Sequence, residues 1–508
     1  MNRPGLLIIL PCGMTVGGVT SWAVRIANGL SRERACGLVL HRPASHAAPW
    51  YPKLEPAVRV FDLSRIAPVE SANGEIEWLV REYRDAARAM GGRVVLFPTL
   101  LGDCFGACAA LTQSSLVDVR LVGFAHSDNG YDARVIEHYK PALNKAAAVS
   151  ARLADTLRAR WRGRERDVRF IATGIEAGGT RTPASGIRTI VYTGRMDENV
   201  KRVSALIHMS DALRARGVDH ALRIVGDGPA AEAVDRMIKE RSGEPARRIE
   251  RVSAATPERV REFLRASEFF VLPSRSEGLS VSMLEAMSEG CCCVVPSQHS
   301  GASEAIENGV SGVLLATDSA ASARSAGEDL AAAIANVSGE RAEAIGAQAR
   351  IVVRERFGIA DHLRAVSMLI DEAAEENARR WPRDKTAAFT ARPGEVGSGT
   401  VPHDADARLR EVMDSLRGRS VAVHGTGRHS IELAHVLSDY SSEIRAYVDD
   451  DPSRQGIEFL GKPVVSPQEA GHLGATDLVI SSSLHQEAIW ARRAEFEQVG
   501  VRVHRLYA

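Results

Sequence analysis

Two glutamates separated by eight positions are the residues whose types and spacing most clearly indicate chemistry. Glu277 lies in a short loop, and Glu285 lies one turn into the predicted helix that follows it. That helix is apolar, with Leu284 and Met287 around the carboxylate, so Glu285 is costly there unless something hydrogen-bonds it. A ligand hydroxyl is one candidate partner, and sugars and ribose both supply hydroxyls. The pair therefore points to a sugar or nucleotide site.

The elements around this loop place it where ligands bind. The runs 269–272 and 291–295 are short and apolar, as expected of strands buried on both faces of a parallel sheet. The loop then lies at the carboxyl end of a strand, which is where such sheets bind ligands. Ser280 can cap the following helix, whose first free N–H groups favour an anion such as a phosphate.

With these elements in place, Glu277 and Glu285 resemble the paired glutamates of retaining GT-B glycosyltransferases, in particular family 4. The resemblance covers about residues 1–376. Taken alone, the pair could also be a solvated helix glutamate and a loop glutamate favoured by the helix dipole.

A second pair of charged residues supports the resemblance. Arg195 directly follows the run 188–194, at the end of a predicted strand. Lys201 comes six residues later, at the start of the next predicted helix. Two cations converging on one cleft could hold a diphosphate, the arginine through its planar fork and the lysine as a point charge. In the family, the matching cations neutralise the leaving nucleoside diphosphate and replace a metal ion. The alternative is a pair of surface cations.

The first third of the chain adds a glycine loop and a histidine. Gly17 and Gly18 follow the first apolar run and match the pair that lets family members bring backbone N–H groups close to the donor phosphate. His126 follows the run 119–125, where family members carry a histidine that touches the donor sugar near the reacting carbon. A glycine loop often serves only a turn, and a lone histidine is often structural.

The resemblance therefore implies a set of site residues without a metal. The implied catalytic residues are His126, Arg195, Lys201 and Glu277. The implied donor-binding residues are Gly17, Gly18, Gly278, Leu279, Ser280 and Glu285. The segment 249–256 lacks the glycine that family members carry beside the base, so UDP- and GDP-sugars both remain candidate donors.

Hydrophobic periodicity predicts an α/β fold. Apolar runs alternate with helical patterns up to about residue 176, and a second such series begins at residue 188. Combined with the resemblance, this predicts the GT-B architecture of two facing Rossmann-like domains, with a third, small Rossmann-like domain at the C-terminus. The expected ranges are 1–180 for the acceptor domain, 181–378 for the donor domain with a final helix crossing back, 379–406 for a linker and 407–508 for the accessory domain.

The third domain carries a glycine turn of its own. Gly425 and Gly427 resemble part of a dinucleotide fingerprint, with Ser430 in place of the final glycine and Asp449 where a ribose-binding acid would sit. A nucleotide at Gly425, Gly427 and Asp449 is one interpretation, and a fold-stabilising or docking role is the other.

Composition limits the kinds of partner and the cellular location that we expect for this chain. Lys plus Arg and Asp plus Glu number 64 each among 508 residues, so no global field recruits nucleic acid. The seven cysteines fit neither a disulfide framework nor a zinc-ligand spacing, which favours a reducing, cytoplasmic location. No apolar run approaches the roughly 20 residues that span a bilayer. The arginine-rich segment 157–169 with Trp161 leaves a weak peripheral contact with anionic lipid at the inner face of the membrane as an option.

The leading hypothesis is an enzyme, a retaining and metal-independent glycosyltransferase that needs no cofactor. It would move a sugar from a nucleoside-diphosphate sugar to a glycan, a lipid-linked acceptor or a small molecule. A sugar phosphorylase of the same architecture and a non-catalytic nucleotide-sugar sensor are the alternatives.

Overall fold

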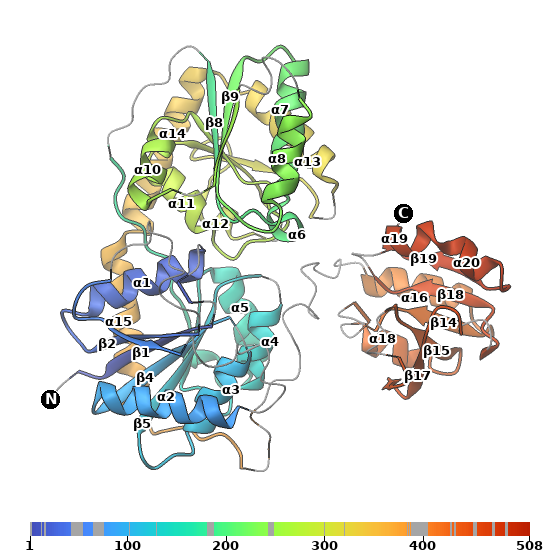
Figure 1. The fold of residues 1–508 in the computed structure, drawn as a ribbon, viewed down its shortest axis with the longest axis horizontal. Helices are drawn as coiled ribbons and strands as arrows, with labels where there is room; N and C mark the ends of the chain where they lie inside the picture. The colour runs from blue at the N-terminus through green and yellow to red at the C-terminus, as the bar shows by residue number, and fades with distance from the viewer. Residues whose placement is uncertain are drawn as a thin grey trace. The chain divides into compact units, whose positions relative to one another are not determined.

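The structure is a computed structural model that falls into two compact units, residues 1–392 and 393–508. It describes the chain except for residues 1–2, 12, 15–16, 42–53, 64–75, 101, 129, 180–186, 242–247, 254, 299, 320, 384, 386, 388–404, 427–428, 431–432, 451–454, 470–472, 483–485 and 508. Figure 1 shows the elements along the chain.

The first sheet of the first unit is parallel throughout, and its inner strands are short apolar runs buried on both faces, whereas the edge strands are partly exposed. Its order is β3 (Arg59–Asp62), β2 (Cys36–Leu40), β1 (Gly5–Leu10), β4 (Arg93–Pro98), β5 (Asp118–Ala125), β6 (Lys145–Ala148) and β7 (Val168–Phe170). The helices between these strands are α1 (Gly18–Leu30), α2 (Glu77–Met90), α3 (Gly102–Leu111), α4 (Tyr131–His138) and α5 (Ala151–Arg160), followed by the 3-10 turn η3 (Glu165–Asp167). The strands expected near residues 6–10, 37–41, 93–97 and 119–125 are confirmed.

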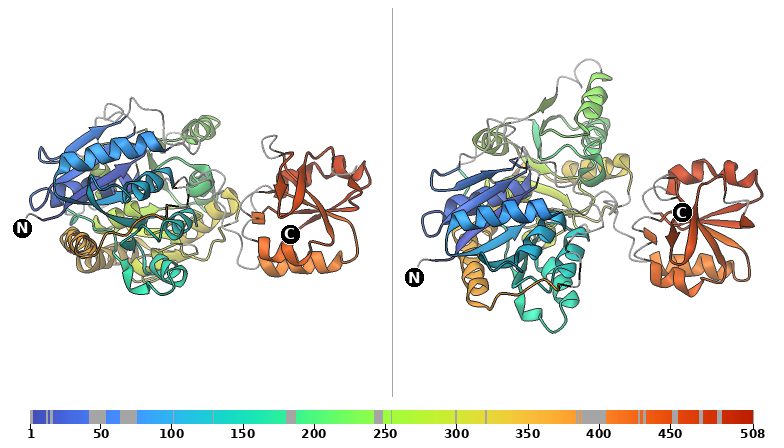
Figure 2. Two further views of the ribbon diagram at one scale, coloured as in Figure 1. Left: turned by 90° about the horizontal axis from the view of Figure 1, so that it is seen from below. Right: turned by 60° about the horizontal axis from the view of Figure 1, so that its bottom comes forward.

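A second parallel sheet follows in the same unit. Its order is β10 (Ile249–Val252), β9 (His220–Val225), β8 (Arg188–Thr193), β11 (Phe269–Val271), β12 (Cys292–Pro296) and β13 (Val313–Leu315). Its helices are α6 (Glu198–Lys201), α7 (Ala205–Ala215), α8 (Ala231–Lys239), α10 (Pro257–Arg265), α11 (Val281–Ser288), α12 (Ala302–Ala305), α13 (Ala323–Ala335) and α14 (Gly339–Arg356). Both views in Figure 2 show helices on the two faces of these sheets.

The chain then returns to the first sheet through α15 (Ile359–Glu375), which lies against α1, β4 and β5. Arg34 fastens this helix, because its guanidinium contacts Asp371 Oδ1 at 3.0 Å and the Ser367 hydroxyl at 2.6 Å. The first sheet is therefore completed by residues more than 300 positions away in sequence.

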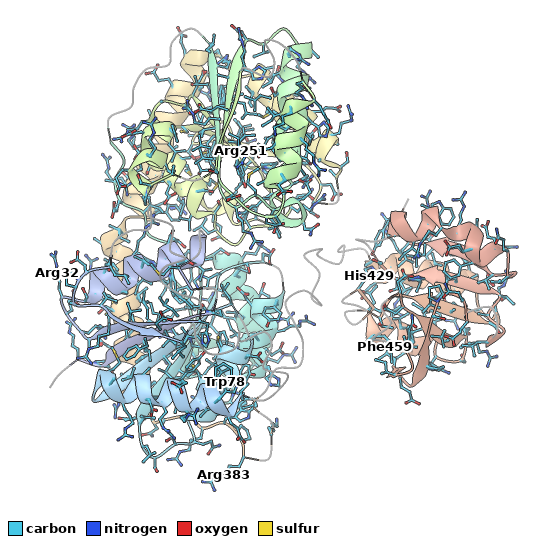
Figure 3. The ribbon with its side chains drawn as sticks, in the orientation of Figure 1. Arg32, Trp78, Arg251, Arg383, His429 and Phe459 are labelled. Carbon is cyan, nitrogen blue, oxygen red and sulfur yellow. The ribbon has the colours of Figure 1, made fainter. Side chains whose placement is uncertain are left out.

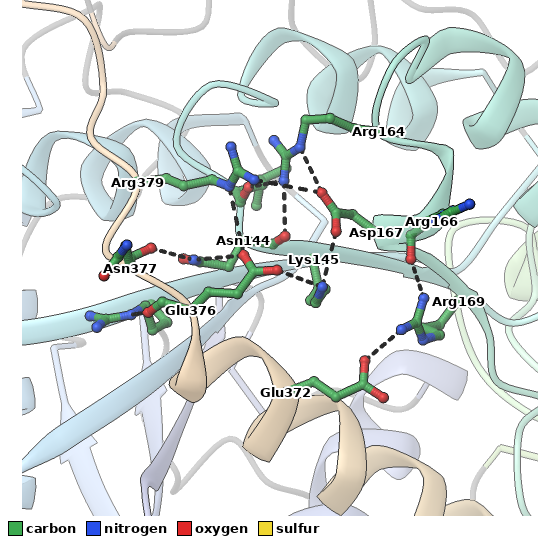
Figure 4. Close-up of polar contacts among 12 residues, drawn as sticks. Asn144, Lys145, Arg164, Arg166, Asp167, Arg169, Glu372, Glu376, Asn377 and Arg379 are labelled. Carbon is green, nitrogen blue, oxygen red and sulfur yellow. Dashed lines mark hydrogen bonds and ion pairs between the residues drawn. The ribbon is translucent and has the colours of Figure 1, made fainter.

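An ionic cluster holds the segment after α15 (Figure 4). The Lys145 ammonium lies 2.9 Å from Asp167 and 2.6 Å from Glu376, and Arg164 lies 2.7 Å from the other Asp167 oxygen. Lys145 is buried, so its charge is acceptable only because two carboxylates share it. The cluster ties the end of α15 to β6 and η3.

Trp381 extends this attachment into the segment expected as a linker. Its ring is 3% exposed and packs on His138 and Tyr139, with centroids 5.4 and 5.2 Å away. Its backbone N–H donates to Thr112 Oγ1 at 2.9 Å. This part of the chain is therefore anchored to the first sheet's helices.

The second unit contains a third sheet, in the order β16 (Glu458–Phe459), β17 (Lys462–Val465), β15 (Ile444–Val448), β14 (Val421–His424), β18 (Asp477–Ile480) and β19 (Arg502–Arg505). All its pairings are parallel except that between β16 and β17. Its helices are α16 (Ala405–Ser415), α18 (Ala434–Asp439), α19 (Gln486–Ala491) and α20 (Arg493–Glu497). The predicted third α/β domain is present, with an apolar core on each face of its sheet.

The Trp381 anchor gives a stability prediction. Trp381→Ala should lower the free energy of unfolding of the first unit by about 3 kcal/mol or more, because a large buried ring leaves a cavity. Trp78→Ala is the matched control, since Trp78 on α2 is half-exposed (Figure 3) and should cost less than half as much. Urea unfolding measures both values, and equal losses would contradict the anchoring role.

Candidate active site

A cleft of about 780 Å³ lies between the two sheets of the first unit. Its lining brings together residues that the sequence placed more than 250 positions apart. The predicted site residues on its wall are Gly17, Gly18, His126, Arg195, Lys201, Glu277, Leu279, Ser280 and Glu285.

The N-terminal ends of two helices meet at this cleft. Ser280 is the N-cap of α11, and its hydroxyl accepts a hydrogen bond from the Met283 N–H at 3.3 Å, which confirms the predicted cap. Gly18 begins α1, and a Cβ built there would lie 3.4 Å from Val281 of α11. Helix N-termini carry free N–H groups and positive partial charge, so this corner of the cleft suits an anion.

Lys201 and Glu277 form an ion pair in the cleft wall. Lys201 lies in the last turn of α6, and Glu277 lies in the loop after β11. Their side chains are 19% and 13% exposed, so the pair is shielded from bulk water but open to a ligand. The residue predicted to bind the phosphate, Lys201, is thus in direct contact with the residue predicted to bind the sugar, Glu277.

Arg195 is more open than Lys201. Its guanidinium pairs with Asp197, yet 57% of the side chain remains exposed. Asp197 is itself fixed, since it caps α6 by accepting from the Val200 N–H at 3.0 Å. The Arg195 guanidinium therefore has one fixed carboxylate partner, and most of the side chain remains accessible to a bound anion.

Two further arginines lie beside α6: Arg202 directly follows it, and the backbone N–H of Arg275 donates to the Val200 carbonyl oxygen at 2.8 Å. Arg202 is fully buried and donates to the carbonyl oxygens of Asp318 and Ala321, while Arg275 donates to that of Ser319 at 2.6 Å. Burial and the neighbouring Arg275 lower the pKa of Arg202 to about 10. Carbonyl oxygens are their direct hydrogen-bond partners, and nearby carboxylates, among them Glu198, partly offset both charges. Sequence reasoning missed them, although Arg202 directly follows Lys201 and Arg275 lies two residues before Glu277.

His126 sits on a loop that one buried carboxylate organises. Asp132 accepts hydrogen bonds from the backbone N–H groups of His126 and Ser127, at 2.8 and 3.0 Å. The imidazole packs on Trp22 and Phe124, and its buried Nε2 has no hydrogen-bond partner among the described residues. Burial lowers the pKa of His126 to about 3, so the ring is neutral at pH 7.

Gly278, the remaining predicted residue, lies at the contact between the two domains. A Cβ there would be 2.3 Å from the carbonyl oxygen of His126, so only glycine permits this approach. Glu304 adds a second contact, because its two oxygens accept from the N–H groups of Ala151 and Arg152 at 2.6 and 3.0 Å. A carboxylate from α12 thus caps α5 of the other domain.

Glu285 has a partner that the sequence did not reveal. Its Oε1 pairs with Arg25 of α1, so the carboxylate expected to meet a ribose is held by a cation from the first domain. The available signal was the polar series Ser21, Arg25 and Asn28, which share one face of an otherwise apolar helix.

In the third domain, Asp449 contacts the glycine turn rather than pointing freely outward. Its Oδ2 accepts from the Thr426 N–H at 2.9 Å and from the Thr426 hydroxyl at 2.5 Å. Ser430 Oγ donates to the Gly425 carbonyl oxygen at 2.6 Å and so closes the turn. Gly427 lies outside the described residues.

The arginine-rich segment differs from the expectation for lipid docking. Trp161 is fully buried, and Arg158, Arg160 and Arg164 are engaged in ion pairs. Trp161 is therefore not placed to contact a lipid surface, while docking of this arginine-rich segment on anionic lipid stays a prediction. No helix in the described part of the chain combines the length and apolar character needed to cross a bilayer. The described residues also contain no cluster of three or more His, Cys, Asp or Glu side chains suited to a metal ion.

Comparison with known proteins identifies the fold and the class of the second domain. Sucrose-phosphate synthase from Thermosynechococcus elongatus superposes with a TM-score of 0.59 at 15% identity, covering 72% of this chain and 98% of that structure. HepE from Anabaena, in complex with UDP and glucose, superposes with a TM-score of 0.54 at 15% identity, covering 72% and 99%. The chain has the GT-B fold, as predicted.

Residues 187–336 match the family model for glycosyl transferases group 1, so the second domain is a domain of that class. A stretch of 137 residues is also 31% identical to EpsF of Bacillus subtilis (strain 168), whose name describes a glycosyltransferase. That match covers 25% of this chain and 33% of EpsF, so the chain aligns with about a third of that relative.

The buried imidazole gives a pH prediction. The pKa of His126 is about 3 in the fold against 6.5 ordinarily, so the unfolded chain takes up a proton first as the pH falls. Its contribution to stability is complete above about pH 6.5 and is lost toward pH 3, at about 1.4 kcal/mol per pH unit. His126→Phe should therefore flatten the dependence of unfolding free energy on pH between 6 and 4, as measured by urea titration. Identical slopes in the two proteins would contradict this.

Proposed function

We propose that this protein is a retaining, metal-independent glycosyltransferase that moves a sugar from a UDP- or GDP-sugar to an acceptor. The acceptor, a glycan, a lipid-linked sugar or a small molecule, would lie on the first domain. The observation that carries the proposal is the convergence of Lys201, Glu277 and Glu285 with the N-terminal ends of α1 and α11 on one cleft. The class of the second domain supports it.

The proposal gives each group a task. The diphosphate would occupy the corner where the two helices begin, with Lys201 and Arg195 beside it. Glu277 would accept from a sugar hydroxyl and Glu285 from the ribose. Bound phosphate would compete with Glu277 for the Lys201 ammonium, so this ion pair would loosen as the donor enters.

Catalysis would then be mainly electrostatic. As the glycosidic bond breaks, negative charge grows on the departing phosphate, where the two cations and the helix N-termini stabilise it. In a front-face reaction with retention, that phosphate also takes the proton of the acceptor hydroxyl, so no enzyme nucleophile is needed. His126 would serve as a neutral hydrogen-bond partner of the sugar, since its imidazole is not protonated at pH 7.

The cations also account for the proposed independence from metal. A divalent ion would neutralise the diphosphate in a metal-dependent transferase. Here Lys201 and Arg195, which both line the cleft, can do so directly.

The third domain is proposed as an accessory. It has its own core and forms a separate compact unit, and a nucleotide at its Gly425 turn is one candidate ligand. Asp449, which accepts hydrogen bonds from Thr426 beside this turn, would contact the ribose. Peripheral lipid contact does not enter the proposal, because Trp161 is buried.

The direct test is a turnover screen. Purified protein is incubated with UDP- and GDP-sugars and a panel of glycan acceptors, and the anomeric configuration of the product is read by NMR. Retention supports the proposal, and inversion contradicts it. Transfer to inorganic phosphate alone would indicate a phosphorylase, and binding without turnover would indicate a sensor.

The paired glutamates give a binding prediction. Glu285→Gln and Glu277→Gln should each weaken donor binding about tenfold or more, because a hydrogen bond to a charged group is worth roughly 1.5–3 kcal/mol. Glu343→Gln, on the exposed surface of α14, is the matched control and should bind as wild type does. Calorimetric titration with the donor measures all three, and unchanged affinity in both site variants would refute the assignment.

Lys201 gives a kinetic prediction. Lys201→Ala should lower kcat/KM about 100-fold or more, because the charge that it meets is greatest in the transition state. Lys239→Ala, at the exposed end of α8, should leave kcat/KM unchanged. Wild-type activity should also survive excess EDTA. If the chelator abolishes turnover and Mg²⁺ or Mn²⁺ restores it, the metal-free mechanism is wrong.

Removal of the second unit gives a third prediction. A chain that ends at residue 392 should keep its fold and basal transfer, because the cleft residues and the Trp381 anchor all precede that point. Initial rates with the same donor and acceptor provide the measurement. A folded but inactive truncated chain would show that the third domain takes part in the reaction.

A further inference from the structure

Arg25 is a cleft residue that the proposed function does not use. It lies on α1, on the polar face formed by Ser21, Arg25 and Asn28, and all three line the cleft. Arg32, which also lines the cleft, lies in the turn just after α1 and is exposed (Figure 3). The opposite face of α1, which includes Ala23, Ala27 and Leu30, is buried in the core. The polar face therefore contributes to the cleft rather than to the core.

The contact between Arg25 and Glu285 engages one terminal nitrogen of the guanidinium and one oxygen of the carboxylate. Nη2 of Arg25 pairs with Oε1 of Glu285, and the two side chains are 18% and 23% exposed. The other terminal nitrogen, Nη1, is buried and has no hydrogen-bond partner among the described residues. The second oxygen of Glu285 likewise receives no hydrogen bond from the described part of the chain.

A buried N–H without a hydrogen-bond partner costs about 1–3 kcal/mol of stability. Because Nη1 of Arg25 lies on a residue that lines the cleft, we expect a bound ligand to supply the missing acceptor. Other acids near this part of the cleft do not supply that partner. Glu176 is already paired with Arg261, and Glu277 is paired with Lys201.

We propose that Arg25 is a donor-binding residue supplied by the first domain, which together with Glu285 clamps the cis-diol of the donor's ribose. This inference rests on the proposed function, in which Glu285 meets that ribose. One ribose hydroxyl donates to the second oxygen of Glu285. The adjacent hydroxyl oxygen accepts from Nη1 of Arg25.

The chemistry of the pair matches a vicinal diol. A guanidinium has only donors and an ionised carboxylate has only acceptors, whereas each hydroxyl can both donate and accept. In a vicinal diol each of the two groups has a hydroxyl of its own, whereas 2′-deoxyribose offers one hydroxyl that must serve both the guanidinium and the carboxylate, so one of the two hydrogen bonds is lost or strained. The clamp therefore selects ribose over 2′-deoxyribose, and it does so with residues from both domains.

The inference also assigns Arg25 a positioning effect on Glu285. The ion pair fixes the carboxylate on the cleft side of α11, so ribose meets an oriented acceptor. Loss of Arg25 should hence weaken ribonucleotide binding more than loss of one hydrogen bond would.

The test is a set of titrations with UDP and GDP and with their 2′-deoxy counterparts. Wild-type protein should bind the ribonucleotide about tenfold or more tightly than the deoxy form, because the deoxy form leaves a charged donor unpaired. Arg25→Met, which keeps the apolar stem, should bind the ribonucleotide at least tenfold more weakly and show a ribose preference close to one. Arg81→Met is the matched control, since Arg81 on α2 is an exposed arginine paired with a glutamate outside the cleft.

The outcomes separate the two proposals. A folded Arg25→Met protein with the wild-type ribose preference would overturn the clamp while leaving the proposed function intact. The same holds if wild-type protein binds ribo- and deoxyribonucleotides equally. If Arg25→Met does not fold, Arg25→Lys decides, because it keeps the charge beside Glu285 but lacks the second nitrogen and should lose the preference alone. Failure of wild-type protein to bind UDP or GDP would defeat both proposals.

Discussion

The close approach of two backbone segments is the constraint on which the cleft depends. The loop at Gly278 meets the carbonyl oxygen of His126 so closely that no Cβ fits between them. This contact brings the carboxyl end of β11 against that of β5, and it sets the distance between the two sheets. Glu304 strengthens the arrangement by capping α5 across the same boundary. A larger side chain at residue 278 would move every cleft residue at once.

Three cations at the cleft each form an ion pair with a carboxylate. Lys201 is held by Glu277, Arg195 by Asp197 and Arg25 by Glu285. Pairing lowers the cost of partly burying these charges while the cleft is empty. A ligand that carries both phosphate and hydroxyls offers a new partner to each member of a pair. Its affinity is therefore the difference between the contacts it makes and the ion pairs it loosens.

The helix that returns from the second domain, α15, provides a further attachment between the two domains of the first unit. α15 packs on the first sheet, and the ionic cluster around Lys145 and the Trp381 ring extend this attachment to the residues that follow. Two peptide connections thus join the domains, one before β8 and one before α15. A chain that crosses twice restricts relative motion of the domains more than one linker would. The second unit begins only after this attachment.

The sequence by itself determined the main strands, the Ser280 cap and nine of the residues that line the cleft. Buried parallel strands read as short apolar runs, a cap depends on neighbours three residues away, and motif positions are local in sequence. The tertiary structure alone decided what these residues meet. Arg25 and Glu285 are 260 positions apart, so no local pattern pairs them, and their contact exists because two domains face each other. Trp161 and Trp381 look like surface residues in arginine-rich stretches, yet both are buried, because burial depends on which elements pack over a side chain and not on its neighbours in sequence.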